Sequence, residues 1–166
     1  MAATKTLDDL FYETLKDIYY AERKISKALP KMARAAQSEE LKQAFQLHKD
    51  ETDGQIERLQ QIFELIGKRA RGKTCAAIEG IIEEGEEIMD EFKGTPALDA
   101  GLLAAAQAVE HYEISRYGTL RAWAKQLGLK DAVSLIEETL AEEERTDEKL
   151  TGLAEDTVNA AAKKAA

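Results

Sequence analysis

The chain has 166 residues, enough for one well-packed core but few for two full domains, so we expect residues 1–166 to form a single domain. Its formal net charge of −9 offers no basic surface to nucleic acid or to an anionic membrane, and no apolar run is long enough to span a bilayer. The N-terminus lacks an apolar signal segment and the single cysteine, Cys75, excludes an internal disulfide framework, so we expect a soluble protein of the cytoplasm that binds cations.

The N-terminal part of the chain predicts one long helix. Only two prolines and ten glycines interrupt a sequence rich in Ala, Glu, Leu and Lys, which favours helix almost throughout. Thr6 followed three residues later by Asp9 is typical of a capping box, and apolar residues recur at helical spacing to about Ala36. Because this spacing continues on both sides of Pro30, we expect a kink there rather than the end of the helix.

Two further helices are predicted in the middle of the chain. Ser38 caps the first of them, which ends at Gly67. The basic segment GKRARGK follows, and its glycines and lack of apolar residues are typical of an exposed connection rather than of a phosphate site. Thr74 begins a shorter helix, which carries isoleucines along one face and ends at Gly94.

Two long helices are predicted in the remainder. Thr95 as N-cap and Pro96 as the first helical residue open a helix that stops near Gly128. The last helix runs from about residue 131 to 153 or beyond, and the tail from about residue 159 is expected to fray. Four long helices and a short one predict an all-α fold: a four-helix bundle with an additional short helix in the crossover between the second and third long helices.

Acidic side chains fall on the predicted buried stripe of every long helix. They are Glu22 on the first helix, Glu51 or Thr52 beside His48 on the second, Glu110 and Glu113 on the third, and Glu143 or Glu144 with Asp147 on the last. The helical period alone does not separate Glu143 from Glu144. The spacing of three residues to Asp147 favours Glu144.

Carboxylates that are buried together need a positive partner, since each unpaired charge costs several kcal/mol or must take up a proton. Most Lys and Arg side chains of the long helices lie off the stripe, whereas two metal ions would neutralise several carboxylates at once. Oxygen ligands with few imidazoles favour two iron ions, with manganese as the alternative. The absence of paired cysteines argues against structural zinc.

Five segments in order along the chain resemble the YciF-type bacterial stress-response proteins, a branch of the ferritin-like superfamily. The segments are YAERKI, HKDETDGQIERL, CAAIEGIIEEGEE, AAQAVEHYEISRYGTL and ETLAEEERTDEKLT. The resemblance implies a ferritin-like four-helix fold, a homodimer, a di-iron centre and a role in stress. The metal ligands that it implies are Glu22, His48, Glu51, Glu110, Glu113, Glu144 and Asp147.

The chain departs from the ligand pattern of ferritin-like oxidases, in which a glutamate is followed three residues later by a histidine. Here His48 precedes Glu51, Gly54 occupies the position three residues after Glu51, and Asp147 stands where the second histidine is expected. The predicted site is therefore richer in oxygen ligands. This departure argues against ferritin-like rates of iron oxidation.

Two functions remain open on this basis, and iron storage in a cage is a third, although it needs a multimer and no sequence feature identifies a cage interface. One is an oxidoreductase in which two ferrous ions, bridged by Glu51 and Glu144, reduce oxygen or peroxide. The other is a structural or partner-binding stress protein in which a metal only stabilises the bundle. Taken singly, Glu22 is also explained by an ion pair with a lysine and His48 by a hydrogen bond near the core. The isoleucine face of the crossover helix suggests the dimer contact.

Overall fold

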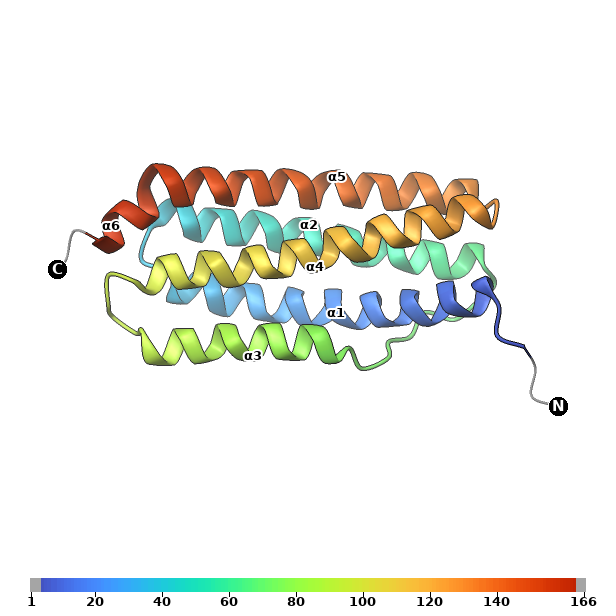
Figure 1. The fold of residues 1–166 in the computed structure, drawn as a ribbon, viewed down its shortest axis with the longest axis horizontal. Helices are drawn as coiled ribbons and strands as arrows, with labels where there is room; N and C mark the ends of the chain where they lie inside the picture. The colour runs from blue at the N-terminus through green and yellow to red at the C-terminus, as the bar shows by residue number, and fades with distance from the viewer. Residues whose placement is uncertain (1–3, 164–166) are drawn as a thin grey trace.

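The structure is a computed structural model that describes residues 4–163. All regular secondary structure in this range is helical (Figure 1). The elements are α1 (Leu7–Ala35), α2 (Glu39–Leu65), α3 (Ala76–Glu91), α4 (Leu98–Gln126), α5 (Lys130–Leu153), the π-helical turn η1 (Ala154–Val158) and α6 (Asn159–Lys163). The predicted all-α fold is confirmed. Residues 159–163 of the tail expected to fray form α6, and the last three lie outside the described residues.

The four long helices form the bundle. α1 packs beside α2 and α4, and α5 packs beside α2 and α4, with α3 laid against α1 and α4. Neighbouring long helices run in opposite directions, because the crossover through α3 returns the chain to the end where α2 began (Figure 1). This is the topology of a ferritin-like bundle with a helix added in the crossover, as predicted.

The ends of the first two helices are set by local hydrogen bonds. The backbone amide of Thr6 donates to Asp9 Oδ2 at 2.8 Å, and Thr6 Oγ1 accepts from the amide of Asp9, which completes the predicted capping box. Ser38 Oγ accepts from the amide of Leu41 at the start of α2. α1 continues through Pro30 and ends at Ala35. The first two helices therefore begin at their predicted caps.

Two predicted helix starts are wrong. The N-cap of α3 is Cys75, one residue after Thr74, and its Sγ accepts from the amide of Ile78. Thr95 and Pro96 lie in the turn before α4 rather than at its start, because Thr95 Oγ1 donates back to the carbonyl of Phe92 at 2.8 Å. α4 begins only at Leu98.

A buried aspartate joins both helical hairpins at one end of the bundle. Asp99, in the first turn of α4, accepts from the backbone amides of Gln37 at 2.7 Å and Ser38 at 2.6 Å. These amides lie between α1 and α2, where they have no partner within a helix. Asp99 therefore fixes the start of α4 against the α1–α2 turn.

The hydrophobic core runs the length of the bundle and is interrupted by polar groups at its middle. Leu15, Ile25 and Leu29 from α1 are at most 3% exposed, as are Leu120 from α4 and Ile136 from α5. Among residues 4–163, no helix has the length and apolar character that crossing a membrane requires.

Candidate metal centre

A histidine and three glutamates from three helices converge in the middle of the bundle. His48 of α2, Glu110 and Glu113 of α4, and Glu143 of α5 are each at most 3% exposed. Each offers one ligand atom, and these atoms lie within 4.8 Å of one another. Because carboxylate oxygens and an imidazole nitrogen are metal ligands, this group can hold a metal ion.

The remaining long helix contributes Glu22. Its side chain is fully buried, and the hydroxyl of Tyr117 donates a hydrogen bond to its Oε1. The charge of Glu143 raises the pKa of the Glu22 carboxyl group. All four long helices therefore place a carboxylate or imidazole in the same buried region.

The five side chains follow a seven-residue spacing along their helices. Seven residues are nearly two helical turns, so side chains at this spacing lie on one stripe. Each of the five is seven residues from a buried residue on both sides. The flanking pairs are Leu15 and Leu29 for Glu22, Leu41 and Gln55 for His48, Leu103 and Tyr117 for Glu110, Ala106 and Leu120 for Glu113, and Ile136 and Leu150 for Glu143.

The preference for Glu144 over Glu143 as the inward residue is wrong. Glu143 is fully buried, whereas Glu144 is exposed. Glu143 lies midway between the buried Ile136 and Leu150, and each residue turns a helix by about 100°, so Glu144 points away from the core. The seven-residue spacing to Ile136 and Leu150 was the sequence signal that would have identified Glu143.

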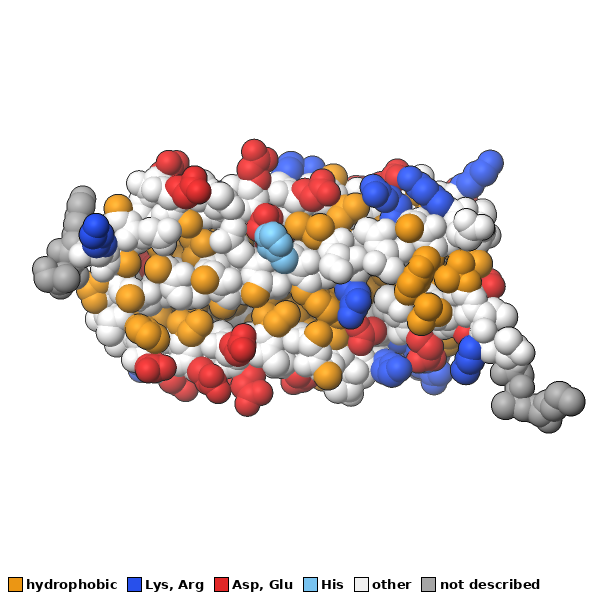
Figure 2. Space-filling view, in the orientation of Figure 1, with side chains coloured by type: hydrophobic (Ala, Val, Ile, Leu, Met, Phe, Trp, Pro, Cys, Tyr) orange, Lys and Arg blue, Asp and Glu red, His pale blue; other side chains and the backbone are white. Residues whose placement is uncertain are grey.

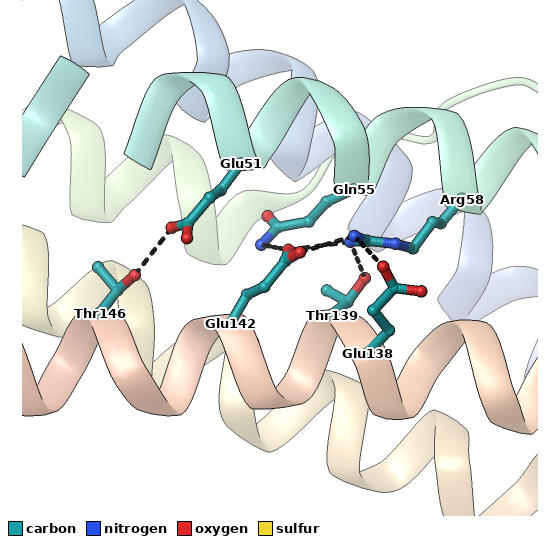
Figure 3. A network of polar contacts seen from close by, with 7 residues as sticks. All are labelled: Glu51, Gln55, Arg58, Glu138, Thr139, Glu142 and Thr146. Carbon is teal, nitrogen blue, oxygen red and sulfur yellow. Dashed lines mark hydrogen bonds and ion pairs between the residues drawn. The ribbon is translucent and has the colours of Figure 1, made fainter. Parts of the chain in front are cut away.

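Two other predicted ligands, Glu51 and Asp147, lie outside the compact group and are only half-buried. Glu51 accepts a hydrogen bond from Thr146 Oγ1 at 3.2 Å, between α2 and α5 (Figure 3). Asp147 Oδ1 lies 3.2 Å from Gln107 Nε2 and 3.1 Å from Nε2 of the exposed His111. Asp147 therefore lies between α4 and α5, and the negative charges of Glu51 and Asp147 both raise the pKa of Glu110.

Burial and mutual repulsion govern the protonation of the group. Burial, together with the charge of Glu143, raises the pKa of Glu22 to about 8. Burial also raises the pKa of Glu110 to about 8. The pKa values of Glu113 and Glu143 lie well above the usual range, because burial and the neighbouring carboxylates disfavour their charged forms.

Most buried polar atoms of the group have no hydrogen-bond partner within the protein. His48 Nε2 lies 3.0 Å from Glu110 Oε1, but the direction does not meet the geometry of a hydrogen bond. Among the described residues, no Lys or Arg forms an ion pair with these carboxylates. The buried atoms of the group without a hydrogen-bond partner are Glu22 Oε2, His48 Nδ1 and Nε2, Glu110 Oε2, both carboxylate oxygens of Glu113 and both of Glu143.

Outside this group, only two buried side-chain atoms of residues 4–163 lack a hydrogen-bond partner, Gln55 Oε1 and Arg116 Nε. Buried polar atoms are normally hydrogen-bonded, and each exception calls for an explanation. Ligand atoms from four residues that lie within 4.8 Å of one another are what a metal site requires. The geometry and the donor set therefore both fit a metal ion.

Comparisons with known proteins agree with this fold. The family described as a domain of unknown function, DUF892, matches residues 6–163. Protein YciF of Escherichia coli (strain K12) is 48% identical over 156 residues, which are 93% of this chain and 94% of that protein. The crystal structure of the E. coli stress protein YciF superimposes with a TM-score of 0.89 at 48% identity and covers 94% of this chain and 99% of that chain.

Two further solved structures share the fold. YcfI of Rhodopseudomonas palustris, for which a structural role has been suggested, is 47% identical with a TM-score of 0.87, over 90% of this chain and 96% of that chain. A protein from Xanthomonas campestris pv. campestris is 21% identical with a TM-score of 0.78, over 96% of this chain and 99% of that chain. The match to the family over residues 6–163, and the 48% identity to YciF, show that this chain belongs to the DUF892 family.

Proposed function

We propose that this protein is a metal-binding, ferritin-like stress-response protein whose buried group holds two iron ions, with manganese as the alternative. The ligands are His48, Glu110, Glu113 and Glu143, together with Glu22. Two divalent ions would neutralise the four carboxylates, which otherwise must be buried charged or take up protons. The observation that carries the proposal is the concentration of buried, unpaired carboxylate and imidazole atoms at one place.

The residues around the group have distinct roles in this proposal. Tyr117 donates a hydrogen bond from its hydroxyl to Glu22 Oε1 and so orients that carboxylate. Glu51, between α2 and α5, and Asp147, between α4 and α5, add negative charge that attracts cations toward the group. Iron bound here would supply electrons for the reduction of oxygen or peroxide. The surrounding leucines and isoleucines keep the site dry.

Metal content after anaerobic loading tests the proposal. We expect two iron ions for each wild-type chain and a loss of at least one in Glu110→Ala, measured by elemental analysis after removal of free metal. Less than about one ion per wild-type chain contradicts the proposal. Oxygen uptake on ferrous addition then separates an oxidoreductase from a metal site without turnover.

A non-catalytic role is the second candidate. It is supported by the position of Glu51 and Asp147, which lie outside the compact group. The compact group then consists of one histidine and three glutamates, all of them buried. In that case a metal joins α2, α4 and α5 and stabilises the bundle without reacting. Two bound ions without oxygen consumption would favour this function.

The homodimer remains a prediction. The isoleucine face of α3, which suggested the contact, packs against α1 and α4 of the same chain and so does not support it. Light scattering of the purified protein measures the oligomeric state directly.

A further inference from the structure

A small apolar cavity lies between α1, α3 and α4. Its volume is about 30 Å³. A water-sized void needs about 10–15 Å³ on this measure, so the cavity is large enough for one molecule of two or three heavy atoms and too small for a lipid or a cofactor. Its apolar lining includes Ile25, Met32, Ile82, Met89, Ala106 and Val109.

The inner end of the cavity reaches the candidate metal centre. His48 and Glu110, two members of the buried group, are the only lining residues with polar side chains apart from Lys31 and Glu86. Lys31 and Glu86 pair with each other at 3.3 Å and are both exposed, so they lie at the outer end. The cavity therefore connects the rim between α1 and α3 with one side of the group.

The outer wall of the cavity is α3. A second ion pair, Lys24 with Glu79 at 2.9 Å, also ties α3 to α1. Among the α3 residues that line the cavity, Gly85 is buried and has no side chain. Figure 2 shows hydrophobic side chains gathered along the line between α3 and α4. The additional helix thus covers the metal group with an apolar and loosely filled layer.

The opposite side of the group is polar. Between α2 and α5, Gln55 Nε2 donates to Glu142 at 3.0 Å, and Arg58 donates to Glu142 and Glu138 at 2.6 and 2.7 Å (Figure 3). No α5 residue lines the cavity, and His48 is its only lining residue from α2. A small apolar molecule therefore has a favourable path on the α3 side, where it displaces no hydrogen-bonded group.

We propose that this cavity binds one small apolar molecule of the size and polarity of dioxygen, beside His48 and Glu110. Apolar cavities of this kind stay dry and take up apolar ligands, because water inside them finds too few hydrogen-bond partners. The cavity gives such a molecule direct access to the candidate metal centre. That access rests on the proposed function, whereas binding in the cavity itself does not require a metal.

The test uses the metal-free full-length chain under dissolved oxygen, whose paramagnetism accelerates the relaxation of nearby protons. We expect the methyl groups of Ile25 and Ala106, and the ring protons of His48, to relax at least about threefold faster than the methyl groups of Ile136. All four residues are at most 4% exposed, so exposure to the solvent does not explain such a difference. Gly85→Leu fills the cavity and should reduce this enhancement to the level of Ile136. The matched control is Gly80→Leu, on the same helix, where a Cβ atom meets nothing within 4 Å.

Each outcome is informative. Equal relaxation of Ile25, Ala106 and Ile136 in the wild-type chain overturns the proposal, as does a long-lived water molecule detected beside Val109. If Gly85→Leu does not fold, Ala28→Leu fills the same cavity from α1 and replaces it. If oxygen enters the cavity but the protein binds no metal, the proposed function fails and the apolar site stands. If the protein binds metal but oxygen does not enter the cavity, the proposed function stands and the proposal for the cavity fails.

Discussion

His48 Nε2 lies 3.0 Å from Glu110 Oε1, and this contact joins α2 to α4 inside the bundle. Replacement by His48→Ala leaves Glu110 buried without its nearest basic neighbour. Because Glu110 can take up a proton, we expect the free energy of unfolding of the metal-free protein to fall by about 1–3 kcal/mol. Urea unfolding at neutral pH measures this change. His111→Ala, at the exposed histidine, should change stability by less than about 0.5 kcal/mol, and an equal effect of both would contradict a special role of His48.

Glu143 and Glu144 provide a matched pair of adjacent glutamates. We expect Glu143→Gln to lower the metal content by at least one ion per chain, because it removes a charge from the buried group. Glu144→Gln should bind as much metal as the wild type, since this side chain is exposed. Elemental analysis after identical anaerobic loading provides the measurement. Equal losses in the two variants would argue against the assignment of Glu143.

The raised pKa values make the stability of the metal-free protein depend on pH. Glu22 and Glu110 have pKa values of about 8 in the folded chain against an ordinary value of 4.5. Between these values the folded chain holds more protons than the unfolded chain. The stabilising contribution is therefore complete below pH 4.5 and is lost as the pH rises through 8.

We expect the free energy of unfolding of the metal-free protein to fall by roughly 1 kcal/mol per pH unit for each group between pH 5 and 8. Metal affinity should rise over the same range, because binding releases these protons. Urea unfolding at several pH values, with and without metal, tests both statements. A metal-free protein whose stability increased from pH 5 to 8 would show that these carboxyl groups are ionised when buried.

Asp99 holds two backbone amides at the α1–α2 turn. Asp99→Ala leaves both without this acceptor, so we expect a loss of about 2 kcal/mol in the free energy of unfolding. The control is Asp50→Ala, at an exposed position in the middle of α2, which should change stability by less than about 0.5 kcal/mol. Thermal or urea unfolding of the two variants gives the comparison. Equal losses in the two variants would show that the hydrogen bonds of Asp99 contribute little to the free energy of unfolding.

The helix boundaries show which parts of the fold are local. Thr6 and Ser38 cap their helices through hydrogen bonds to amides three residues away, so these starts follow from neighbouring residues. Thr95 and Pro96 have the composition of a helix start, yet Thr95 bonds back to Phe92 and α4 begins later. The same residue types suit a turn and a helix start, and here the hydrogen bond from Thr95 to Phe92, the C-cap of α3, favours the turn.

The sequence by itself determined the helices, their apolar stripes and the presence of buried acids on all four long helices, because the helical period depends only on local geometry. Glu22, His48, Glu110 and Glu113 are buried as expected for this reason. The seven-residue spacing to Ile136 and Leu150 also favours Glu143 over Glu144 as the inward residue. Only the tertiary structure decided that Glu51 and Asp147 stay at the edge, and that a cavity opens beneath α3. These features depend on the rotation of each helix about its axis, which contacts with distant helices set.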